Sequence, residues 1–258
     1  MWDIITNTIR EFFRLKIIYI WLFIWVVLIF SSYLLDTLTI NQWNKAIIDF
    51  SLSVIEIFAL ILTLFLGSYL LYNEFNKKTV LLALSRMKDK YKFIIWKFIW
   101  FSIILLFLYI ILWFWFYLAL LFHHISFEWF YIQAMFLSYM KILVILAFVI
   151  FFSTFVSPFL ALLSSLFIYF VAHASAFMLF FAQIDQEKII SPFVKILLKW
   201  IYYVLPNFQD LSMKEYFLSP QLWTYTTTHF ILSATWWALV YIFILLVLSS
   251  LIFNKKEF

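Results

Sequence analysis

The chain has no cysteine and only one glycine among its 258 residues. The lack of cysteine excludes disulfide bonds, thiolate metal sites and a cysteine nucleophile. A single glycine cannot build the glycine-rich loop that cradles phosphates, so the chain has no nucleotide-binding P-loop of its own. These two absences exclude several classes of enzyme before any pattern is considered.

Charged residues are also scarce, at 12% of the chain, whereas 67% of the residues are hydrophobic. A soluble domain carries about 25% charged and about 45–50% apolar residues. A water-soluble core could not take up this much apolar surface, so we expect the lipid bilayer to be the solvent. The composition therefore predicts an all-α polytopic membrane protein with a single transmembrane domain over residues 1–258.

Apolar runs long enough to cross a bilayer predict six transmembrane helices. The runs cover residues 17–35, 50–72, 93–122, 130–156, 159–182 and 230–253. The fourth run departs most from a purely apolar pattern, because it contains Lys141. Ser157 and Pro158 separate the fourth run from the fifth with almost no loop.

Two segments outside these runs are amphipathic. Residues 2–16 place Asp3, Arg10 and Arg14 on one helical face, which favours a helix lying in the membrane interface; an ordinary flank of the first span is the alternative. No small-residue cleavage site follows, so we do not expect a signal peptide. Residues 183–229 form the longest interruption and predict two short surface helices, which Pro206 and the residue after it separate.

The segment between the second and third runs is strongly basic. Tyr72 to Lys97 contains Lys77, Lys78, Arg86, Lys88, Lys90, Lys92 and Lys97, against Glu74 and Asp89. By the positive-inside rule this loop, residues 73–92, faces the cytoplasm, and with six spans both termini do as well. Val80, Leu81, Leu84 and Met87 recur at helical spacing and predict a short helix with one apolar face.

Small residues form stripes in two of the runs. The second run has Ala59, Thr63 and Gly67, and the fifth has Ala161, Ser165, Ala172 and Ala176. Small side chains let helix backbones approach closely in lipid. The stripes indicate either ordinary packing within the chain or, for the fifth run, a subunit interface.

Two charges fall inside predicted spans, Glu56 in the second and Lys141 in the fourth. Charges within a membrane are expensive and point to function by default. The two are a candidate ion pair that would close the opening between these spans on the outer side of the membrane. The alternative is that each lies near the outer end of its span and reaches back to the interface.

The sequence contains no recognisable catalytic or metal-binding motif, so we expect no enzymatic activity and no metal in this chain. There is no HExxH segment, and the acidic residues are scattered. His123 and His124 are adjacent and so do not share a helical face. Glu128 is the one nearby carboxylate, so we expect a polar span end there rather than a metal site.

The order of these parts resembles the membrane subunit of ABC type-2 exporters, the ABC-2 permease superfamily. In that family the loop after span two has a Glu, a Thr after a Gly or Arg, a Leu-rich helical turn, and a Gly-Lys entering span three. Here the matching places hold Glu74, Lys78-Thr79, Leu81-Leu82, Leu84-Ser85-Arg86 and Lys97. The sequence departs from the family at Met87, Asp89-Lys90 and Trp96, where proline, Ser-Arg and glycine are usual. Arg10-Glu11-Phe12, Leu205-Pro206-Asn207-Phe208 and Phe253-Asn254-Lys255-Lys256 also look like the family.

The resemblance implies the permease subunit of an exporter in the cytoplasmic (inner) membrane of a prokaryote. The chain would bind no cofactor and no nucleic acid. Cytoplasmic ABC ATPase subunits would hold ATP and Mg, and a second permease copy, alike or a sister chain, would complete the pathway. The residues that would couple to the ATPase are Glu74, Lys78, Thr79, Val80, Leu81, Leu84, Arg86, Met87 and Lys97.

Other functions remain open from the residues alone. One alternative is an integral membrane enzyme or assembly factor that acts on lipid without nucleotide. Another is a channel or secondary transporter, although the two halves of the chain show no matched broken helices. The basic loop would then serve only to fix the orientation of the chain.

Overall fold

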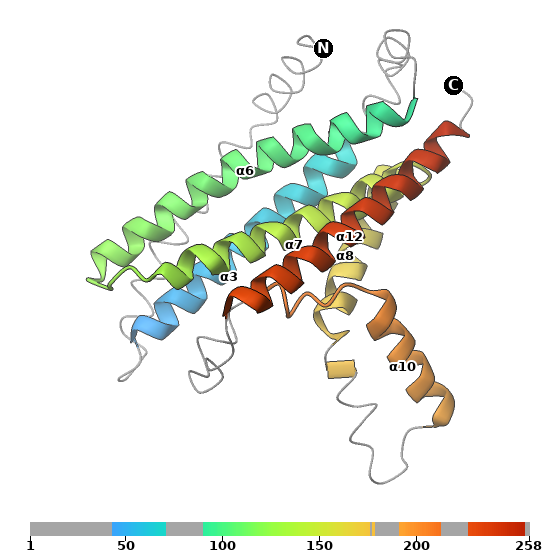
Figure 1. Ribbon diagram of the computed structural model, residues 1–258. Helices are drawn as coiled ribbons and strands as arrows, with labels where there is room; N and C mark the ends of the chain where they lie inside the picture. Colours follow the sequence, from blue (N-terminus) through green and yellow to red (C-terminus); the bar gives the residue numbers. More distant parts are fainter. Residues whose placement is uncertain (1–42, 71–89, 176, 179–190, 213–226, 256–258) are drawn as a thin grey trace. The chain divides into compact units, whose positions relative to one another are not determined.

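The computed structural model describes residues 43–70, 90–175, 177–178, 191–212 and 227–255 (Figure 1). Over these residues it contains six α-helices and one π-helix, and no strand. The elements are α3 (Trp43–Phe65), the π-helix η1 (Leu66–Leu70), α6 (Lys90–Phe122), α7 (Trp129–Ser153), α8 (Pro158–His173), α10 (Pro192–Val204) and α12 (Thr227–Asn254). The predicted all-α class is confirmed for this part of the chain.

Four of these helices are long and apolar enough to cross a membrane. The candidate spans are Ile48–Ser68, Tyr91–Phe122, Trp129–Ser153 and His229–Asn254. They correspond to the predicted second, third, fourth and sixth spans, so the chain is a multi-pass membrane protein. The predicted first span and the helix over residues 2–16 lie outside the described residues.

Helix α8 is shorter than the predicted fifth span. It ends at His173, although the apolar run continues to residue 182. At 1.5 Å per residue its 16 residues extend about 24 Å, less than the roughly 30 Å of hydrocarbon in a bilayer. The carbonyl oxygen of Ala172 accepts hydrogen bonds from the Ser175 hydroxyl at 2.8 Å and from the backbone N–H of Phe208 at 3.4 Å. These bonds give a carbonyl group at the C-terminal end of the helix its hydrogen-bond partners.

The second predicted span also begins earlier than expected. The apolar run was predicted to begin at residue 50, whereas α3 starts at Trp43 and makes Asn44, Lys45 and Asp49 helical. The candidate membrane span within it begins at Ile48. Three polar residues in two turns of helix do not outweigh the long apolar segment that follows and that tertiary packing stabilises as a helix.

The described residues fall into two compact units. The first contains residues 43–58 and 107–127, and the second contains residues 59–70, 90–106 and those from 128 onward. In the second unit α7 packs against α12, α8 and η1, and α7 and α12 run side by side (Figure 1). Every residue of α7 from Lys141 to Ile150 is buried. An evenly apolar helix of this kind belongs at the centre of a bundle.

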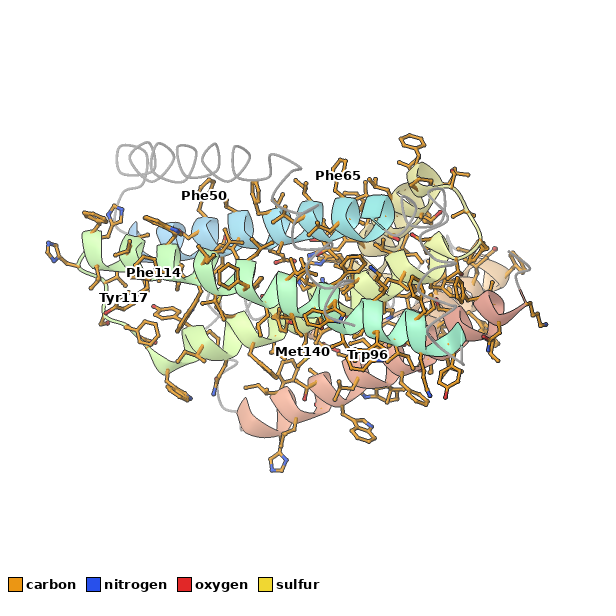
Figure 2. All side chains as sticks on the ribbon, turned by 90° about the horizontal axis from the view of Figure 1, so that it is seen from above. Phe50, Phe65, Trp96, Phe114, Tyr117 and Met140 are labelled. Carbon is orange, nitrogen blue, oxygen red and sulfur yellow. The ribbon has the colours of Figure 1, made fainter. Side chains whose placement is uncertain are left out.

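In the second unit, α12 has one buried face and one exposed apolar face that suits contact with lipid. Ala234, Ala238, Ile242, Leu245 and Ser249 are buried and recur at helical spacing. Large apolar side chains cover much of the remaining surface of this helix. Helix α6 also has exposed aromatic side chains, among them Trp96 in the second unit and Phe114 in the first (Figure 2). An apolar surface of this extent fits a bilayer as solvent.

In the first unit, α6 ends in a backbone motif at the two histidines. The N–H of Ile125 donates to the carbonyl of Leu120 at 3.0 Å, and the N–H of His124 donates to that of Leu121 at 3.2 Å. His124 has a φ of 54°. This pair of bonds around a left-handed residue is the Schellman motif that stops helices. The ring of Phe127 then packs edge-on to Trp113 and Tyr117, with centroids 6.2 and 5.8 Å away.

Candidate functional site

The small residues of the second predicted span lie at the joint between α3 and η1. Ala59, Thr63 and Gly67 are all buried. A Cβ added at Gly67 would lie 2.6 Å from Cγ1 of Val149, so the absent side chain allows η1 to approach α7. The Thr63 hydroxyl donates to the carbonyl of Ala59 at 2.6 Å and so satisfies itself within the helix. The stripe therefore serves contacts within one chain.

The small residues of the fifth predicted span also pack against other parts of the same chain. Ala161, Ser165 and Ala172 are buried within the chain, and the Ser165 hydroxyl donates to the carbonyl of Ala161 at 2.8 Å. Ala176 lies outside the described residues. Because the three described residues already pack inside one chain, a contact with a second permease copy would use other side chains.

Both intramembrane charges are buried. Lys141 is 0% exposed and Glu56 is 2% exposed. Lys141 stands at the midpoint of α7, twelve residues from either end, which places it about 18 Å from each end of the span. The burial of both side chains within the chain favours a role inside the protein over reaching back to the interface, and both readings stay hypotheses. Each lies in a different compact unit, and their pairing stays a prediction.

Lys97 is the predicted coupling residue that falls within the described part of the chain. Its Nζ lies 5.9 Å from the ring centroid of Phe93 and 5.8 Å from that of Phe101, one turn before and one turn after it on α6. Phe93 in turn stacks on Phe253 of α12 with centroids 5.7 Å apart. The buried ammonium thus sits among aromatic rings, which favour a cation.

The other predicted coupling residues, Glu74, Lys78, Thr79, Val80, Leu81, Leu84, Arg86 and Met87, lie outside the described residues. Among the residues that are described, no three His, Cys, Asp or Glu gather where they could hold a metal ion. His123 and His124 belong to the turn that ends α6.

Sequence reasoning missed a pocket that α10, the loop after it and α12 form within the second unit. Its volume is about 320 Å³. The α12 wall consists of Phe230, Ser233, Ala234, Trp237, Ala238 and Tyr241, and the opposite wall consists of Tyr202, Tyr203, Leu205, Pro206, Asn207, Asp210 and Leu211. The α12 residues follow helical spacing, with small Ala234 and Ala238 at the buried floor and aromatic rings on both sides.

The loop after α10, which contains Asp210, is held against α8 by several contacts. Phe208 is 0% exposed, and its backbone N–H donates to α8 at Ala172. Its ring centroid lies 6.0 Å from that of Tyr169, also on α8. The Asn207 Oδ1 accepts a hydrogen bond from the N–H of Gln209 at 3.2 Å, and the Ser175 hydroxyl lies 3.4 Å from the same oxygen. Contacts within the chain therefore hold this wall of the pocket in place.

Asp210 is the acidic residue of this pocket. Burial raises the pKa of the Tyr202 phenol, and the negative charge of Asp210 and the neighbouring Tyr203 raise it further. Asp210 and Tyr202 line the same pocket, so the negative charge lies close to this aromatic wall. Among the described residues that line the pocket there is no lysine, arginine or histidine.

Comparisons with protein-family models, with curated proteins and with solved structures returned no match for this chain.

Proposed function

We propose that the chain is the membrane-spanning permease subunit of an ATP-driven ABC exporter. It has six spans, both termini in the cytoplasm of a prokaryote, and a helix in the loop over residues 73–92 that couples to a separate ABC ATPase. A second permease copy completes the pathway, and the ATPase holds ATP and Mg. This chain itself carries out no catalysis.

The observation that carries the proposal is the order of elements in the second unit. Helix α8 is followed by amphipathic α10, by a loop that folds back onto α8, and by the long apolar α12. The ABC-2 resemblance predicts the same order, with a helical outer loop between the last two spans. The match supports the proposal through an arrangement of parts and not through a single motif.

The buried charge in the middle of α7 gives further support. A lysine at 0% exposure halfway along a membrane helix is expensive, and such residues mark transport pathways more often than packing sites. A protein whose only task was to pack in lipid would place leucine or methionine there. The position of Lys141 therefore favours transport over a purely structural role.

Co-purification of the full-length chain from its native membrane tests the coupling. We expect an ABC ATPase to accompany the wild-type protein and to be lost from Leu84→Asp, because an aspartate on the apolar face cannot enter a hydrophobic groove. Leu82→Asp is the matched control, since Leu82 falls on the opposite face of the predicted helix and should retain the ATPase. Equal recovery of the ATPase with both variants, or no ATPase with the wild-type protein, would contradict the proposal.

A further inference from the structure

We propose that the pocket between α10 and α12 is a binding site for a quaternary ammonium group. Aromatic residues from two helices surround it: Tyr202 and Tyr203 come from α10, and Phe230, Trp237 and Tyr241 come from α12. The faces of such rings carry negative charge density and attract cations that water solvates weakly. The lining residues are not residues of the predicted coupling segment, and the claim does not depend on the chain being an exporter.

The charge of the pocket favours a cation over an anion. The Ser233 hydroxyl donates to the carbonyl of Phe230 at 2.9 Å, within its own helix. The Asn207 side-chain oxygen already accepts the N–H of Gln209. Among the described lining residues the charged side chain is the carboxylate of Asp210, and no lysine or arginine opposes it there.

The size and rigidity of the pocket agree with a small head group. Its volume of about 320 Å³ lies at the lower end of the range of small-molecule sites, roughly 300–1,000 Å³. The loop with Asp210 is held on α8 through buried Phe208. A preformed site of this kind loses little entropy when it binds a rigid ligand. A trimethylammonium group meets these conditions.

The alternative role for the aromatic residues is anchoring at the membrane interface, where tryptophan is common. The chain supplies an internal control for this role, because Trp236 and Trp237 are neighbours on α12 and are 67% and 62% exposed. Only Trp237 lines the pocket. A difference between the two positions therefore measures the pocket and not the interface.

The test is equilibrium binding of radiolabelled choline to the full-length protein in phosphatidylglycerol nanodiscs. We expect saturable binding that unlabelled choline displaces and its neutral isostere, 3,3-dimethylbutan-1-ol, does not. Trp237→Leu should weaken binding by about 2- to 30-fold, and Trp236→Leu should leave it within about twofold. Asp210→Asn should weaken it by about two- to fivefold, since this carboxylate is exposed. Unchanged melting temperatures would show that the variants are folded.

Nanodiscs of phosphatidylcholine then identify the source of the ammonium group. Reduced choline binding there would indicate that the lipid head group occupies the pocket, and unchanged binding would indicate a free compound. Displacement by the neutral isostere, equal effects of Trp236→Leu and Trp237→Leu, or no saturable binding would each overturn the proposal. Because no ATPase takes part, these outcomes are independent of the co-purification experiment.

Discussion

At the scale of single residues, Gly67 decides how closely two helices of the second unit approach. A side chain at this position would meet Val149, since the nearest atom to an added Cβ is Cγ1 of that residue at 2.6 Å. Valine is stiff about its first torsion and cannot swing aside. The chain's single glycine therefore stands at a position where a larger residue requires the helices to separate.

We expect Gly67→Val to destabilise the protein by about 1–3 kcal/mol, because it overfills the contact between η1 and α7. Val149→Ala should be destabilising alone but should restore part of the stability when combined with Gly67→Val, since it removes the clashing methyl groups. Thermal unfolding of the four proteins in detergent measures this coupling. Additive losses in the double variant would show that the two residues do not meet.

Lys97 illustrates how a charge is accommodated near the start of a span. The stem of the side chain is buried, and its ammonium lies about equally far from the rings of Phe93 and Phe101. The three residues occupy successive turns of α6, so local sequence spacing alone brings them together. The stacking of Phe93 on Phe253 then joins this cluster to the C-terminal end of α12.

At the scale of elements, α10 shows how an amphipathic helix can stay at a surface while holding a site. Phe193, Ile196, Trp200 and Tyr203 are exposed apolar residues, whereas Leu198 and Tyr202 are half-buried. The side chain of Ser191 caps the helix by accepting the N–H of Val194 at 3.4 Å, and Pro192 occupies the first turn. The exposed apolar side chains suit the membrane interface, and Tyr202 and Tyr203 at the end of the helix line the pocket.

The loop after α10 depends on one buried ring. Phe208→Ala should lower the free energy of unfolding by about 3–5 kcal/mol and expose residues 205–212 to protease, because the ring that holds the loop on α8 is removed. Phe193→Ala is the matched control, since Phe193 is exposed on α10 and its loss should change stability by less than about 0.5 kcal/mol. Equal melting temperatures and equal cleavage of the two variants would contradict this account.

Some of these elements could be predicted from the sequence and others could not, for physical reasons. Long apolar runs and helical spacing are local properties, so α6, α7 and α12 appear near their predicted places. The end of α8 was missed because no proline or glycine marks it; the N–H of Phe208, far along the chain, binds the carbonyl of Ala172 instead. The pocket was missed for the same reason, since its walls come from segments that only folding brings together. The spacing of Phe230, Trp237 and Tyr241 was the one local signal available.

At the scale of the whole molecule, the number of spans depends on whether α8 crosses the membrane. Its 16 residues are few for a span, but residues 175, 177 and 178 are again helical beyond the bend at Ala174. Phe159, Leu163, Phe167 and Phe170 are exposed apolar residues along its length and need lipid as their neighbour. Crossing would place α10 outside and the end of α12 in the cytoplasm, as six spans require.

The absence of cysteine makes this topology directly measurable, because a single introduced cysteine is the only site for a thiol reagent. The variants Phe155→Cys, Lys199→Cys and Lys255→Cys place that thiol at exposed positions before α8, on α10 and after α12. We expect a membrane-impermeant maleimide to label position 199 in intact cells, and positions 155 and 255 only after permeabilisation. If α8 does not cross, positions 155 and 199 will react on the same side and 255 on the other. That result would remove α8 as the fifth span and, with it, the outer position of the pocket.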